Sequence, residues 1–172
     1  MNTYCFLLLA LLAAPLAARA QTSTTAETAL RQRVTALLAA YGRQDVAGVL
    51  ALAEPGVVMI GTDSAEVCVG RAAVARQLRD DFLLWLRMEF GAPEHLHLAL
   101  DGRLASAFFD VPSTVAREGN RRDRYYLRFA TTWRKAPDGQ WYLVQSMNSV
   151  PTKGQSAGEL AEKYGLRKGM RE

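Results

Sequence analysis

Residues 123–135 have the sequence DRYYLRFATTWRK, in which large apolar side chains alternate with charged and polar ones. A period of two places successive side chains on opposite faces of a β-strand. One face would hold Tyr125, Leu127, Phe129, Thr131 and Trp133, and the other would hold Tyr126, Arg128, Thr132 and Arg134. The pattern predicts one long strand whose first face is buried and whose second face is partly exposed to water.

Three more stretches near this strand have the same period. We expect strands over 94–101, 104–111 and 140–149. The turns between the last strands are signalled by Asp101-Gly102, Gly119-Asn120 and Pro137-Asp138-Gly139. On the last strand, an inward Trp141 and Leu143 would bring Gln145 and Met147 to the same face. The second half of the chain is therefore predicted to be a run of antiparallel strands.

The first half has helical periodicity instead. Thr24 and Glu27 form a capping box ahead of apolar residues at helical spacing, which are Leu30, Val34, Leu37, Leu38 and Tyr41. Asp45 is placed to cap a second, short helix that Pro55 ends. Strands over 57–60 and 66–69 then precede a third helix over about 71–87, with a stripe of Val74, Leu78, Phe82 and Trp85. This order predicts an α+β fold with helices grouped against one face of a bent sheet.

Three stretches carry a family resemblance. They are Ala40-Tyr41-x-x-x-Asp45, then Ile60-Gly61-Thr62-Asp63-x-x-Glu66-x-x-x-Gly70, and finally Trp141-x-Leu143-Val144-Gln145 leading to Ser149-Val150-Pro151. With these motifs the chain resembles the nuclear transport factor 2-like superfamily, and within it the SnoaL-like subgroup. The resemblance implies a cystatin-like α+β barrel, that is, a cone-shaped, curved antiparallel sheet with three N-terminal helices.

The resemblance also implies a pocket at the wide end of the cone. The residues expected to contact a ligand there are Tyr41, Trp85, Tyr125, Leu127, Phe129, Trp133, Gln145 and Met147. A mostly apolar wall with a few polar groups suits a small-molecule site, but a filled core has the same composition. Both interpretations stay open from the sequence alone.

Some residues depart from the family's catalytic patterns. Met147 stands where the subgroup often has a histidine, and a thioether cannot take up a proton. The positions that match the base and the oxyanion donor of the steroid isomerase branch are Ile60 and Leu37. Neither side chain can move a proton or donate a hydrogen bond, so we expect no ketosteroid isomerase activity.

Two carboxylates are the remaining catalytic candidates. Asp63 and Glu66 lie three residues apart around the predicted turn and could serve as an acid–base pair. Asp63 could equally stabilise the turn, with Glu66 paired to an arginine. His95 and His97 share one face of a strand but lack the further ligands that a metal site needs. We expect no metal and no cofactor.

The N-terminus predicts export. Residues 1–20 contain a short apolar run and end in Ala18-Arg19-Ala20, as a cleavable signal peptide does. We expect a SnoaL-like domain over 21–151, a tail over 152–172 with a short helix near 157–164, and a periplasmic or secreted location without a stable membrane anchor. Cleavage would leave Cys68 as the single cysteine, which we expect to be buried. An exported domain with a small positive charge is not expected to bind nucleic acid.

Three functions follow as hypotheses. The first is a domain that binds a small apolar or amphipathic ligand without an assigned reaction. The second is a homodimeric assembly module that uses the outer sheet face with Tyr126 and Tyr142. The third is an isomerase, hydrolase or dehydratase that uses Asp63 or Glu66 as its base.

Overall fold

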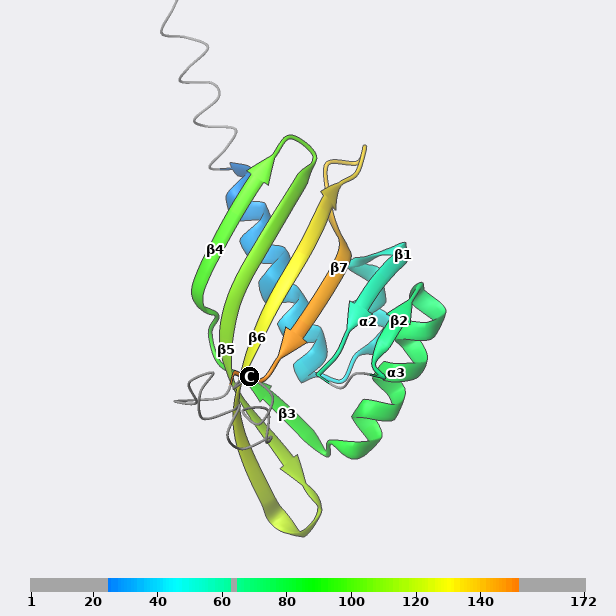
Figure 1. Cartoon of the computed structure of the whole chain (residues 1–172), viewed down its shortest axis with the longest axis vertical. Coiled ribbons are helices and arrows are strands. Elements are labelled where there is room, and N and C mark those ends of the chain that lie inside the picture. Colours follow the sequence, from blue (N-terminus) through cyan, green and yellow to red (C-terminus); the bar gives the residue numbers. More distant parts are fainter. Residues whose placement is uncertain (1–24, 63–64, 152–172) are drawn as a thin grey trace, which may run out of the picture.

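The computed structural model describes residues 25–62 and 65–151, which form helices packed on one curved sheet (Figure 1). The elements in chain order are a first helix over 25–42, α2 (Val46–Ala51), β1 (Ala53–Ile60), β2 (Val67–Val69), α3 (Arg71–Leu84), β3 (Arg87–Phe90), β4 (Glu94–Asp101), β5 (Leu104–Arg117), a 3-10 turn (Glu118–Asn120), β6 (Arg121–Lys135) and β7 (Trp141–Ser149). The predicted signal peptide and the predicted tail helix lie outside the described residues. In the described part of the chain, no helix is long and apolar enough to cross a membrane.

The sheet has seven strands in the order β2-β1-β7-β6-β5-β3, with β4 paired to β5. Its pairs are antiparallel except for β1 and β7, which run parallel. The two ends of this order do not pair with each other, so the sheet curves without closing. The predicted α+β class, with helices on one face of a curved sheet, is confirmed.

Strands β5 and β6 form the long hairpin at the centre of the sheet. Its register places Phe109 opposite Phe129, and their rings stack with centroids 5.2 Å apart. The predicted alternation on β6 is confirmed, because Leu127, Phe129 and the other inward residues are buried while Tyr126 and its neighbours on the second face are exposed.

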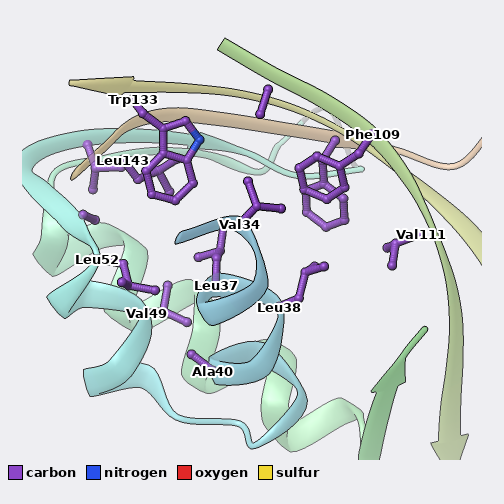
Figure 2. Packing of buried hydrophobic residues seen from close by; sticks show 14 of the residues in the cluster. Val34, Leu37, Leu38, Ala40, Val49, Leu52, Phe109, Val111, Trp133 and Leu143 are labelled. Atoms are coloured by element: carbon purple, nitrogen blue, oxygen red, sulfur yellow. The ribbon is translucent and has the colours of Figure 1, made fainter. Parts of the chain in front are cut away.

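The core lies between the first helix and the concave face of the sheet (Figure 2). The helix buries Leu30, Val34, Leu37, Leu38 and Ala40 against sheet residues that include Phe109, Trp133 and Leu143. The one polar atom of the Trp133 side chain is satisfied, since Nε1 donates to Thr131 Oγ1 at 2.9 Å. That hydroxyl donates in turn to the Ala107 carbonyl oxygen at 3.0 Å. This end of the cone is therefore a closed core in which the polar atom of Trp133 is satisfied, whereas Nε1 of the buried Trp141 has no hydrogen-bond partner among the described residues.

The short second helix begins as predicted. Asp45 caps it by accepting a hydrogen bond from the Gly48 amide at 2.8 Å. The helix ends at Ala51, before Pro55, and Pro55 lies inside β1. The pairing of β1 with β7 shifts between Ala53 and Val58, so the proline falls where the ladder is interrupted.

The third helix is shorter than predicted, and a strand follows it. Helix α3 ends at Leu84, and Trp85 adopts an extended backbone. The Gln44 amide group donates to the carbonyl oxygens of Phe82 and Trp85, which satisfies the end of the helix. Leu83, Leu84 and Leu86 widen the apolar stripe in the sequence, but all three are exposed. The chain turns here because β3 can pair with β5, which supplies more hydrogen bonds than another helical turn would.

The orientation predicted for two residues of the last strand is wrong. Thr132 pairs with Gln145 and Trp133 pairs with Leu143, so Val144 is an extra residue in β7. This bulge reverses the alternation beyond Leu143. Ser146 is consequently buried, while Gln145 and Met147 lie on the exposed face of the sheet.

Replacing Leu37 with alanine should lower the free energy of unfolding by about 2–5 kcal/mol, since it opens a cavity in the closed core. The matched control is Leu83→Ala on α3, where the side chain is 81% exposed and the change should stay within about 0.5 kcal/mol. Urea unfolding measures both. Equal losses in the two variants would contradict this description of the core.

Candidate functional site

A cavity of about 310 Å³ occupies the other end of the cone. It lies between the last turn of the first helix, α3, the β1–β2 hairpin and the inner faces of β3, β5, β6 and β7. Its apolar wall consists of Met59, Ile60, Val74, Leu78, Met88, Val115, Leu127 and Val150. Its polar and aromatic side chains are Tyr41, Thr62, Glu66, Cys68, Gln77, Asp81, Trp85, Tyr125 and Asn148. The cone is thus filled at one end and open at the other.

Four of the eight predicted ligand contacts line this cavity. They are Tyr41, Trp85, Tyr125 and Leu127. Phe129 and Trp133 continue the same row of β6 but belong to the closed core, where they are 3% and 0% exposed. Gln145 and Met147 face away from the cavity because of the bulge in β7.

Asp81 is the most unusual group in the cavity. Gln77 lies one turn earlier on α3, and its side-chain amide donates to Asp81 Oδ1 at 2.9 Å. Burial raises the pKa of Asp81, the carboxylates of Glu66 and Asp80 raise it further, and the hydrogen bond from Gln77 only partly offsets them. Among the described residues no cation contributes to this balance, so the carboxylate is held in a wall that disfavours its charge.

Tyr41 places a hydroxyl group in the same cavity. Its ring packs edge-on against Phe82 and Phe90, with centroids 6.2 Å and 6.4 Å away. The hydroxyl group has the Met59 sulfur at 4.0 Å, which is a weak acceptor. Burial raises the pKa of Tyr41 well above its ordinary value, and the charge on Asp81 adds to that effect. The phenol therefore stays neutral.

The turn between β1 and β2 brings the predicted acidic pair to the cavity only in part. Glu66 lines the cavity, and the Glu66 carbonyl accepts a hydrogen bond from the Gly61 amide at 2.9 Å. Asp63 lies outside the described residues, so the pair stays a prediction. Cys68 is half-buried on β2 and also lines the cavity.

Sequence reasoning missed Gln77, Asp81 and Asn148. A signal for the first two is present, because both fall on the apolar stripe that Val74, Leu78 and Trp85 define. A polar residue on such a stripe is costly unless it has a use or a partner. Asn148 could not be found in this way, since it faces inward only because of the bulge in β7.

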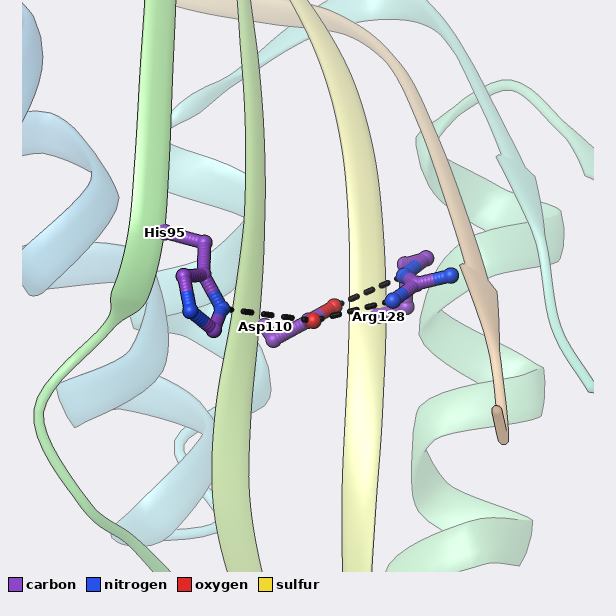
Figure 3. A network of polar contacts seen from close by, with 3 residues as sticks. All are labelled: His95, Asp110 and Arg128. Carbon is purple, nitrogen blue, oxygen red and sulfur yellow. Dashed lines mark hydrogen bonds and ion pairs between the residues drawn. The ribbon is translucent and has the colours of Figure 1, made fainter. Parts of the chain in front are cut away.

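The histidine pair lies on the outer side of the sheet. His95 Nδ1 is 3.8 Å from Asp110 Oδ2, and Arg128 binds both oxygens of that carboxylate (Figure 3). The hydrogen bonds from Arg128 lower the pKa of Asp110. Within residues 25–62 and 65–151, no group of three or more His, Cys, Asp or Glu side chains could hold a metal ion.

A curved sheet that wraps around one helix and encloses a cavity beside it is the architecture of the nuclear transport factor 2-like class. The family model of the SnoaL-like domain matches residues 30–153. The chain therefore belongs to the SnoaL-like domain family.

Solved structures agree with this fold. An NTF2-like superfamily protein from Salmonella enterica has a TM-score of 0.70 and 17% identity, with 78% of this chain and 97% of that chain covered. A proposed scytalone dehydratase from Novosphingobium aromaticivorans has a TM-score of 0.70 and 13% identity, with 77% and 89% covered. A proposed NTF2-like dehydratase from Streptomyces avermitilis has a TM-score of 0.67 and 17% identity, with 74% and 97% covered. These identities show a shared fold alone, and no curated protein matches the chain.

The positions compared with the steroid isomerase branch have different surroundings. Ile60 lines the cavity, whereas Leu37 is buried in the closed core and is 1% exposed. The absence of ketosteroid isomerase activity stays a prediction.

Asp81→Asn should raise the free energy of unfolding at pH 7. The folded state holds the Asp81 proton more tightly than the unfolded state does, so stability falls as pH rises from the ordinary carboxyl pKa, about 3.9, through the raised one. The amide removes this cost and still accepts from Gln77. Urea unfolding at pH 7 and below pH 3.9 should show a gain that disappears in acid. Asp101→Asn, at the exposed end of β4, is the control, and a loss of stability at pH 7 in the Asp81 variant would contradict the assignment.

Proposed function

We propose that this protein binds a small molecule with an apolar body and at least one polar group in the cavity at the open end of the cone. The observation that carries the proposal is the cavity of about 310 Å³, in which apolar walls surround a few convergent polar side chains. This volume lies at the lower end of the range of small-molecule sites, about 300–1,000 Å³.

The shape of the wall supports a ligand rather than a packing defect. Val115, Leu127 and Met88 offer apolar surface from three different strands. Asp81 and Gln77 face this surface from α3, with Asn148 on β7. Evolution usually fills an empty core with apolar side chains, because an open cavity and a desolvated carboxylate both cost stability. The presence of an open cavity and a desolvated carboxylate at one place therefore supports a ligand-binding role for this region.

Acid–base chemistry in the same cavity is the second candidate. Two of the similar solved structures are proposed dehydratases. Glu66 and Asp81 supply two carboxylates beside apolar walls, which suits proton transfer to a bound substrate. We place this candidate second because the similarity to these two structures extends to the fold alone. A substrate must also bind in the cavity before any reaction can follow.

We propose, in addition, that the domain acts outside the cytoplasm. The support is the sequence of residues 1–20, with its apolar run and its Ala18-Arg19-Ala20 ending.

Filling the cavity should abolish binding. Cys68→Phe places an aromatic ring in the cavity. The control is Val69→Phe, which adds the same ring at the next residue of β2, where the native side chain is 66% exposed. Saturation-transfer NMR with the neutral probe 3-phenylpropan-1-ol should detect binding to the wild type and to the control, and a loss of about tenfold or more in Cys68→Phe. Val115→Phe is a second filling variant. Unchanged binding in both filled variants, with circular dichroism showing intact folds, would refute the site.

A homodimer is a further proposal, and the outer face of the sheet supports it. Phe108 pairs with Ala130, and Ala130 pairs with Met147, so a row of exposed apolar side chains crosses three strands. Tyr126 on β6 is exposed on the same face. Tyr142, also expected there, instead has its hydroxyl group bonded to Asp138 at 2.9 Å.

Phe108→Glu should convert a dimer into a monomer, because it puts a charge in the centre of the apolar row. Leu83→Glu, on the exposed side of α3, should leave the dimer, and therefore its sedimenting mass, unchanged. Sedimentation velocity at micromolar concentration distinguishes the two states. A monomeric wild type would overturn this proposal.

A further inference from the structure

We infer that the cavity selects an organic cation, that is, a protonated amine carried on an apolar body. The inference rests on the proposed binding function and adds the charge of the ligand. Four features of the described cavity carry it: the sign of its charges, one carboxylate oxygen without a partner, a phenol with a weak partner, and aromatic rings in the wall.

The charges in the cavity are of one sign. Glu66 and Asp81 line it, and the described lining residues include no lysine, arginine or histidine. The chain as a whole is basic, with 21 Lys and Arg against 17 Asp and Glu, so the acidic character of the cavity is not a reflection of composition. The arginine at the start of α3, Arg71, donates to the Ala53 carbonyl oxygen instead. A cationic ligand would supply a counter-charge for Asp81, beside which the described residues place no cation.

The hydrogen-bonding capacity of the cavity is that of an acceptor. Gln77 donates to Asp81 Oδ1, and no described residue donates to Asp81 Oδ2. The Tyr41 hydroxyl group uses its proton on the Met59 sulfur, which leaves the lone pairs of its oxygen for a donor. An ammonium group has donors and no acceptor, so it complements both atoms.

Aromatic rings complete the match. Tyr41, Trp85 and Tyr125 come from the first helix, the end of α3 and β6, and all three line the cavity. The faces of such rings attract ammonium groups, most strongly where water is excluded. Carboxylates beside aromatic rings therefore suit an amine with an apolar body.

Other ligand classes fit less well. An anion would meet the carboxylate of Asp81, beside which the described residues place no cation. A bare metal ion needs more ligands than the described residues bring together. A neutral alcohol could donate to Asp81 Oδ2, but it would leave the charge of that carboxylate uncompensated, and a charge-assisted hydrogen bond is stronger.

The pH dependence of binding has a definite sign. The groups that face Asp81 are Gln77 and Asp80 on its own helix, Glu66 before β2, Tyr41 on the first helix and Cys68 on β2. Since none of them is a cation, Asp81 releases its proton at a higher pH than an ordinary carboxyl group does. A primary amine has a pKa of about 10 and stays protonated over the acidic and neutral range, so its affinity should rise as pH rises through the titration of Asp81.

The test compares three probes that share one body and differ in charge. They are 3-phenylpropan-1-amine, which is protonated at pH 7, 3-phenylpropan-1-ol and 3-phenylpropanoate, and each is titrated into the full chain by calorimetry at pH 7. We expect the cation to bind at least about tenfold more tightly than the alcohol, and the carboxylate to bind most weakly. Added salt and lower pH should lower the affinity of the cation and leave the affinity of the alcohol unchanged.

Variants locate the effect. Asp81→Asn and Glu66→Gln should each lower the affinity of the cation by about tenfold or more and leave the affinity of the alcohol unchanged. Asp101→Asn removes a carboxylate at the exposed end of β4, away from the cavity, and should change the affinity of neither probe. The salt and pH series on the wild type keep the inference testable where a variant does not fold.

The outcomes separate the two proposals. Equal affinity for the cation and the alcohol, or tighter binding of the carboxylate, overturns the cation inference and leaves the binding function standing. Failure of all three probes to bind overturns both. A cation preference that survives in Asp81→Asn and Glu66→Gln overturns the assignment to this cavity.

Discussion

The inward face of β6 is packed at one end and open at the other, and the rest of the molecule depends on this division. Trp133 and Phe129 press against the first helix and close the core. Leu127 and Tyr125 continue the same row past the end of that helix, where α3 and the β1–β2 hairpin enclose a cavity instead. One row of alternating side chains therefore supports both the stability of the fold and the wall of the site.

Much of this could be predicted from the sequence, because alternation on β6 and helical spacing before it are local patterns. The helix–sheet order and the buried row from Leu127 to Trp133 follow from them. The bulge at Val144 does not, since it depends on how β7 pairs with β6, and it reversed the predicted orientation of Gln145. The end of α3 was set by the pairing of β3 with β5, which is also a long-range contact. The bulge thus displaced two of the eight predicted ligand contacts, Gln145 and Met147, while Phe129 and Trp133 face inward as predicted but belong to the closed core.

The electrostatics of the cavity contrast with those of the outer sheet face. On the outer face, Asp110 is held by Arg128, and its pKa is lowered. In the cavity, Asp81 is held by a neutral amide, and its pKa is raised. The same residue type therefore stabilises the fold in one place and costs stability in the other. Unpaired charge at the open end of the cone is a cost that a bound cation would offset.

The NMR titration of the Asp81 side-chain carboxyl carbon, in the unliganded protein, tests this account most directly. The account predicts a midpoint above the ordinary aspartate value of about 3.9, because the carboxylate lies in a partly desolvated wall where the described neighbours include other acids and no cation. A midpoint at or below the ordinary value would show a solvated or paired carboxylate. The half-filled cone with an unbalanced acidic wall would then be wrong.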